Sequence, residues 1–140
     1  RQIWPPGDGA LEREATAQRA WTERLRAGGA ALGGIEPYGP PDADERLPHL
    51  VCLGVDGIEP QAVLLGLDRA GVAAHSGSAC ASEGLEPSPV LAAMGVDAHR
   101  SLRLSTGWSS SEDDVDAALA ALPGILEHLR GLSGGAPADR

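Results

Sequence analysis

The sequence predicts an α/β domain of two layers, in which a small sheet has helices packed on one face. Apolar residues recur at helical spacing in three long segments, and short apolar runs of strand length lie between them. The 140 residues match the size of one domain with one core. Alternating helices and strands on this scale favour the two-layer arrangement, whereas the order of the strands cannot be read from the pattern.

The first half of the chain predicts one long helix and one strand. Residues 11–32 carry apolar side chains at helical spacing until a pair of glycines ends the pattern. A Pro-rich, acidic stretch over residues 37–44 then leads into a strand at residues 50–55, which stops at an Asp-Gly pair.

The next helix is expected to begin at Pro60, because a first-turn proline loses no hydrogen bond, and to end at Gly71. Residues 72–75 are expected to form a short strand that leads into a loop rich in Ser, Gly and Ala.

Beyond this loop, Ser88 is a predicted N-cap for a short helix over residues 89–94. In residues 101–106 apolar and polar side chains alternate, which places Arg103 on the face away from the leucines. The last helix is expected to begin at Ser111, which caps it, and its first turn holds three acidic residues, which are well placed at a positive helix end.

Residues 1–9 are interpreted as a loose lead-in, residues 10–132 as the folded domain and residues 133–140 as a disordered tail. The chain begins with Arg and contains one Met, which suggests a fragment of something longer.

Composition excludes several classes of partner. The net charge of -9 argues against binding to nucleic acids or to an anionic membrane surface. No apolar run reaches the length of a membrane span, and no basic segment followed by an apolar one opens the chain, so a cytoplasmic location is expected. Two cysteines make no disulfide framework.

Cys80 is the candidate reactive residue. Its neighbours from residue 76 to residue 82 are all Ser, Gly or Ala, so no bulky side chain shields the sulfur. Cations lower a thiol's pKa, and Arg103 and His75 are the candidates. Cys52, within an apolar strand, is interpreted as a small buried side chain.

All 11 Lys and Arg residues are arginine, so the chain contains no lysine. An internal Schiff base with pyridoxal phosphate requires a lysine amine. This chain therefore cannot hold that cofactor in the usual covalent way.

Five short motifs carry a family resemblance: Ser-Gly-Ser-Ala-Cys at residues 76–80, Leu-Glu-Pro-Ser at residues 85–88, Val-Leu at residues 90–91, Ala-Met-Gly at residues 93–95 and Ser-Leu-Arg-Leu-Ser-Thr-Gly at residues 101–107. In order and spacing the chain resembles the C-terminal small domain of cysteine desulfurases, pyridoxal-phosphate enzymes of aminotransferase class V. Its long cysteine loop is similar to the branch that serves iron–sulfur cluster assembly and tRNA thiolation.

The resemblance implies the small domain of the fold-type I pyridoxal-phosphate-dependent transferases. It implies that Cys80 is catalytic and takes sulfur from L-cysteine as a persulfide, and that Arg103 binds the substrate carboxylate. The implied partners are a sulfur acceptor, either a cluster scaffold or a tRNA-thiolation enzyme, and a second subunit in a homodimeric complete enzyme. The larger, lysine-bearing cofactor domain of the family is absent here, so the chain alone should be inactive.

His75 stands where the family often has a small residue and receives no role. Two other interpretations remain open. One is a stand-alone persulfide carrier or partner-binding module that uses Cys80. The other is a metal site formed by His49, Cys52, His75 and Cys80, which is weakened because residues 49 and 52 would face opposite sides of a regular strand.

Overall fold

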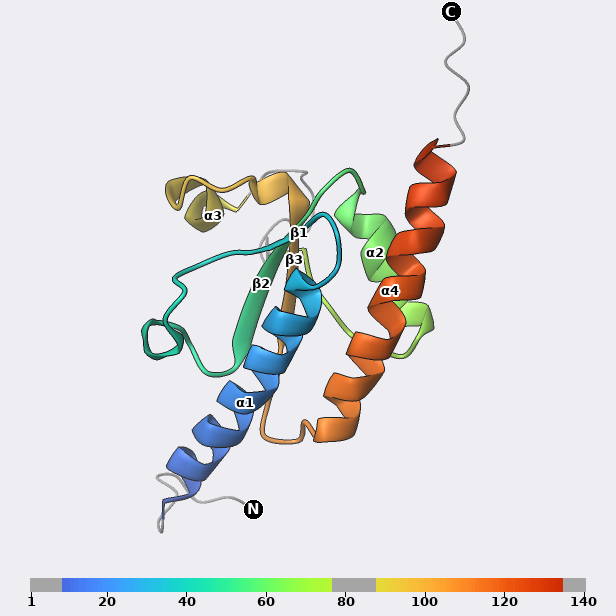
Figure 1. Ribbon diagram of the computed structural model, residues 1–140. Coiled ribbons are helices and arrows are strands. Elements are labelled where there is room, and N and C mark those ends of the chain that lie inside the picture. The colour runs from blue at the N-terminus through green and yellow to red at the C-terminus, as the bar shows by residue number, and fades with distance from the viewer. Residues whose placement is uncertain (1–8, 77–87, 135–140) are drawn as a thin grey trace, which may run out of the picture.

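The computed structural model describes residues 9–76 and 88–134. In chain order these form α1 (Ala10–Ala30), β1 (Ile35–Pro37), the 3-10 turn η1 (Ala43–Glu45), β2 (Leu50–Val55), α2 (Pro60–Arg69), α3 (Pro89–Ala93), the 3-10 turn η2 (Ala98–Arg100), β3 (Ser101–Ser105) and α4 (Glu112–Gly134) (Figure 1).

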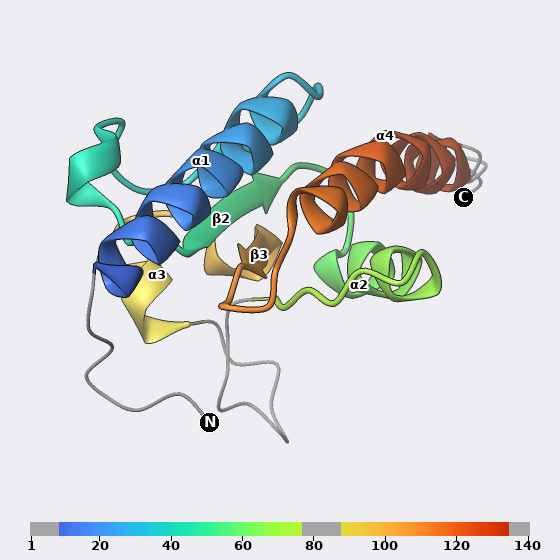
Figure 2. The same ribbon diagram turned by 90° about the horizontal axis from the view of Figure 1, so that it is seen from below.

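The three strands form one antiparallel sheet in the order β1-β2-β3, with β2 in the centre. The core lies between this sheet and the helices α1, α2 and α4. Figure 2 shows α1 and α4 on one side of the sheet and the short α3 on the other. The predicted α/β class, with a small sheet and the main helices on one face, is confirmed.

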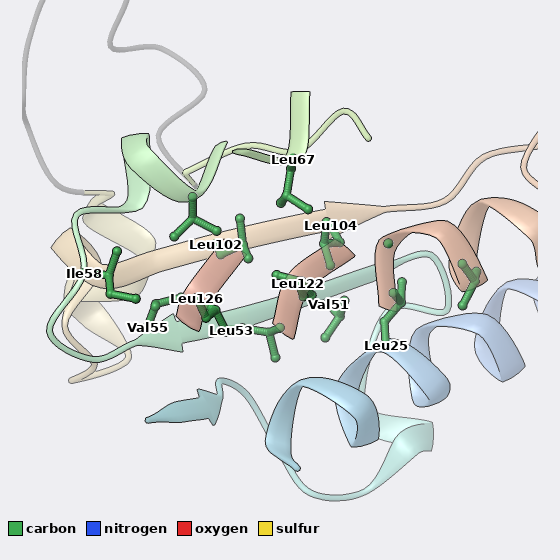
Figure 3. Close-up of a cluster of buried hydrophobic side chains, with 13 residues drawn as sticks. Leu25, Val51, Leu53, Val55, Ile58, Leu67, Leu102, Leu104, Leu122 and Leu126 are labelled. Atoms are coloured by element: carbon green, nitrogen blue, oxygen red, sulfur yellow. The ribbon is translucent and has the colours of Figure 1, made fainter. Parts of the chain in front are cut away.

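Alternation along the strands decides which side chains enter the core. Val51, Leu53 and Val55 of β2 are buried against the helices, together with Leu102 and Leu104 of β3 (Figure 3). Full burial of one such side chain contributes roughly 1.5–3 kcal/mol. The intervening residues of both strands consequently face the other side of the sheet.

Local chemistry sets the helix ends as predicted. Pro60 occupies the first turn of α2, and Gly71 follows that helix with a φ of 80°. Ser88 caps α3, because its Oγ accepts a hydrogen bond from the Leu91 N–H at 3.5 Å, and Gly95 follows α3 with a φ of 73°.

The start of α4 is a reciprocal cap. The Ser111 N–H donates to the Asp114 carboxylate at 2.8 Å, and the Asp114 N–H donates to Ser111 Oγ at 3.4 Å. The predicted serine cap is confirmed.

Two predicted boundaries differ from the structure. Residues 72–75 form no strand, and only His75 makes a bridge to β3. At the other end α4 runs to Gly134, two residues beyond the expected end of the domain. The rest of the expected lead-in (1–8) and tail (135–140) lies outside the described residues. Within the described ranges, no helix is long and apolar enough to cross a membrane.

Candidate functional site

Arg103 lies between two other chain segments in the sheet. Its N–H donates to the His75 carbonyl at 2.6 Å, and its carbonyl accepts from the His75 N–H at 3.0 Å. On its other side it is opposite Cys52 of β2. Because both backbone groups of Arg103 are engaged by His75, Arg103 and Cys52 form a non-hydrogen-bonded pair, the kind in which opposed side chains come closest.

Residues that are directly opposite in an antiparallel ladder extend their side chains from the same face. Three side chains therefore lie together on one face of the sheet, those of Cys52, Arg103 and His75. The leucines Leu102 and Leu104 lie on the opposite face and are buried in the core. The prediction that Arg103 points away from the apolar side of its strand is confirmed.

Arg103 and Cys52 line a hollow of about 420 Å³ between α1 and α3. This volume lies within the range of small-molecule sites, roughly 300–1,000 Å³. Leu50, Leu91 and Met94 contribute to an apolar lining. The hollow thus combines apolar walls with an arginine, Arg103, an arrangement suited to a small organic anion.

Two further arginines of the hollow already have partners. Arg46 pairs with Glu23, and Arg26 donates to the Tyr38 carbonyl at 3.0 Å. Within residues 9–76 and 88–134, no carboxylate forms an ion pair with Arg103. No carboxylate of the described residues therefore occupies the Arg103 guanidinium, which can bind an anion.

Cys52 differs from its predicted role. It is only partly buried and lines the hollow, because the core-facing positions of β2 are 51, 53 and 55. Burial raises the pKa of the Cys52 thiol, and the nearby Arg103 offsets part of that effect. The thiol is neutral at pH 7, so it does not compensate the charge of Arg103.

Cys80 lies outside the described residues. The described residues that border its segment are Ser76, whose carbonyl accepts a hydrogen bond from Ser101 Oγ, and Ser88, which lines the hollow. Among the described residues no three His, Cys, Asp or Glu side chains are grouped to hold a metal ion. His49, Cys52 and His75 therefore form no metal site by themselves.

Curated relatives are cysteine desulfurases. The chain is 42% identical to Cysteine desulfurase IscS of Clostridium botulinum over 107 residues, which cover 74% of this chain and 27% of that protein. It is 40% identical to a cysteine desulfurase of Gluconacetobacter diazotrophicus and 37% identical to Cysteine desulfurase NifS of Azotobacter vinelandii, each over 88% of this chain and 31% of the relative. The chain thus spans less than a third of the length of these relatives.

Solved structures confirm the fold. The apo structure of the cysteine desulfurase from Thermococcus onnurineus NA1 superposes with a TM-score of 0.70 at 23% identity, over 86% of this chain and 28% of that one. A NifS-like protein from Rickettsia africae gives 0.69 at 22% identity, over 84% and 30%.

The family match covers most of the folded domain. The sequence model described as Aminotransferase class-V matches residues 8–118, which include α1, the whole sheet and the start of α4. With these residues matched, the chain belongs to the aminotransferase class-V family.

Proposed function

We propose that this chain is the small domain of a cysteine desulfurase, in which Cys80 accepts sulfur from L-cysteine as a persulfide and Arg103 binds the substrate carboxylate. The observation that carries the proposal is the position of Arg103, which lines the hollow without a carboxylate partner among the described residues. A guanidinium suits a carboxylate because its planar fork donates two parallel hydrogen bonds.

The relatives' class implies pyridoxal phosphate, but the residues of this chain do not fit its covalent attachment. The sequence contains no lysine, and no other side chain forms the internal Schiff base. The cofactor, which acts as an electron sink when bound, would therefore be held by another domain. The chain alone should release no sulfide from cysteine.

Cys80 is assigned by its motif and by the small residues around it. A sulfur carried as a persulfide must pass to a second protein, for which a cluster scaffold or a tRNA-thiolation enzyme is the proposed acceptor. Reduced thiols persist in the cytoplasm, which is the proposed location. The complete enzyme is proposed to be a homodimer, as the family resemblance implies.

The test of Arg103 uses a chimera in which this chain replaces the matching residues of the Gluconacetobacter diazotrophicus relative. Arg103→Lys keeps the charge but loses the fork, which should cost roughly 1.5–3 kcal/mol of substrate binding. The apparent constant for cysteine then rises about tenfold to a hundredfold. The matched control is Arg100→Lys, since Arg100 pairs with Asp56 and Asp97 at the surface and should leave the constant unchanged.

The test of Cys80 uses sulfide release by the same chimera. Cys80→Ser should abolish release while cysteine still binds, because a hydroxyl is essentially never ionised at neutral pH. Cys52→Ser, the control, should retain activity. Full activity in Cys80→Ser would rule out the persulfide, and an unchanged cysteine constant in Arg103→Lys would rule out the carboxylate contact.

A further inference from the structure

Ser101 is a fully buried polar residue at the start of β3. It is 0% exposed, and its Oγ donates to the Ser76 carbonyl and lies 3.1 Å from the Ala98 carbonyl. A hydroxyl carries one proton, which these two carbonyls share. The Ala98 contact is local, whereas the Ser76 contact joins β3 to a segment 25 residues earlier in the chain. Ser101 therefore ties β3 to a distant segment.

The bond to Ser76 lies beside a second attachment of the same segment. The His75 N–H donates to the Arg103 carbonyl at 3.0 Å, and the His75 carbonyl accepts from the Arg103 N–H at 2.6 Å. Both His75 and Ser76 are thus held by β3, one through the backbone and the other through the Ser101 side chain. These bonds fix the point from which the chain continues toward Cys80.

The side chains of Ser101 and Arg103 share a face of β3. Alternation places positions 101 and 103 together, on the face opposite the core-facing leucines of this strand. Two residues of an antiparallel strand span about 7 Å. One short strand therefore carries both the arginine proposed for the substrate carboxylate and the attachment of the segment that contains Cys80.

Sulfur transfer depends on the separation of these two features. In that step the Cys80 thiolate forms an S–S bond to the sulfur of the bound cysteine. The C–S bond of the substrate breaks, and its electron pair stays with the carbon skeleton, which takes up a proton. Cys80 is four residues after Ser76, and four residues span at most about 14 Å. A restraint on Ser76 therefore narrows the volume in which the thiol can meet a substrate held at Arg103.

We propose that Ser101 is a positioning residue for sulfur transfer, because its hydroxyl holds Ser76, where the Cys80 segment begins, at a set distance from Arg103. An alanine at position 101 would fit the same space but would leave the Ser76 carbonyl without this donor. The inference rests on the proposed function, since it takes Cys80 as the sulfur acceptor and Arg103 as the carboxylate site.

The test measures persulfide formation by the chimera in a single turnover with L-cysteine. Ser101→Ala is the variant, and Ser111→Ala is the matched control, since it also removes a bonded serine hydroxyl, at the Asp114 cap of α4. One lost hydrogen bond should lower Tm by about 4 °C, so both variants of the chain alone should lose similar stability. A difference in transfer between them is then not a stability effect.

Ser101→Ala should form the Cys80 persulfide about tenfold more slowly, because small displacements of reacting groups reduce rates steeply. Its apparent constant for cysteine should stay unchanged, since Arg103 remains in its strand. This pattern is the reverse of that expected for Arg103→Lys, and Ser111→Ala should change neither value. An unchanged rate in Ser101→Ala, or equal slowing in both serine variants, would overturn the positioning role.

Amide hydrogen exchange in the chain alone measures the attachment without turnover. In Ser101→Ala the amides of His75 and Arg103 should exchange about tenfold faster, because the bond next to their bridge is lost and the segment opens locally more often. Ser111→Ala should leave both amides unchanged. Equal exchange in Ser101→Ala and the unmodified chain would overturn the proposal, also where the chimera does not fold.

The two proposals fail in different ways. A persulfide that forms on Cys80 as fast in Ser101→Ala as in the unmodified chimera would overturn the positioning role and retain the proposed function. A Cys80 that takes up no sulfur in the unmodified, folded chimera would overturn the proposed function, and this inference with it.

Discussion

Gly54→Ala should destabilise the domain strongly, because the sheet has no room for a side chain at this position. A Cβ at Gly54 would lie 2.4 Å from Tyr38 Oη and 2.5 Å from Tyr38 Cζ. Tyr38 is 5% exposed and donates its hydroxyl to the Asp97 carbonyl at 3.0 Å. Overpacking costs about 1–3 kcal/mol, and the displaced hydrogen bond about 1 kcal/mol more, so the free energy of unfolding should fall by about 2–4 kcal/mol.

Thermal and urea unfolding measure this loss. At about 4 °C per kcal/mol for a domain of this size, Tm should fall by about 8–16 °C. Gly107→Ala is the control, since apart from its two chain neighbours no described residue has an atom within 4 Å of the added Cβ, and its Tm should be unchanged. In a double-mutant cycle, Gly54→Ala should destabilise the Tyr38→Ala variant less than it destabilises the wild-type chain, because the clashing ring is gone. A neutral Gly54→Ala, or losses that simply add, would refute the contact between this tyrosine and the strand.

Three further outcomes are expected. Borohydride treatment of the chain with pyridoxal phosphate should fix no cofactor to a side chain, and mass spectrometry would detect a contrary adduct once the α-amino group of Arg1 is excluded. Burial raises the pKa of Cys52, so the folded state holds the thiol proton to higher pH than the unfolded state does, and the free energy of unfolding should fall above about pH 8.5. In Cys52→Ser, urea unfolding at increasing pH should show a smaller decrease in this free energy. Identical pH profiles for the two proteins would contradict the prediction. Gly124 lies inside α4, and among the described residues nothing beyond its own helix turn and chain neighbours lies within 4 Å of an added Cβ. Gly124→Ala should therefore stabilise the domain by roughly 0.5–1 kcal/mol, and a lower Tm would count against this.

Local chemistry explains why much of the fold could be predicted from the sequence. The alternation around Arg103 determined its face, and Pro60, Ser88 and Gly95 marked helix ends by their own backbone preferences. The strand expected over residues 72–75 was wrong because its alanines favour strands weakly, and only His75 reaches β3. Similarly, α4 continues past the expected boundary, since each added helical residue gains a hydrogen bond.

The site was harder to predict because it depends on contacts between distant residues. Nothing in the apolar run around Cys52 showed that this residue would be opposite Arg103 or would line a hollow. Strand order and register arise from tertiary packing, and a shift of one residue would have turned Cys52 into the core. The two-residue spacing of Val51, Leu53 and Val55 was the one available signal for the face on which Cys52 lies, because it leaves position 52 on the other side of the strand.

The residue that accepts the sulfur can be identified directly. The chimera is incubated with L-cysteine in the absence of oxygen and acceptor protein, alkylated and digested, and the peptides containing Cys80 and Cys52 are weighed by mass spectrometry. We expect one additional sulfur atom on the Cys80 peptide and none on the Cys52 peptide. An unmodified Cys80 while sulfide accumulates, or the additional sulfur on Cys52, would contradict it.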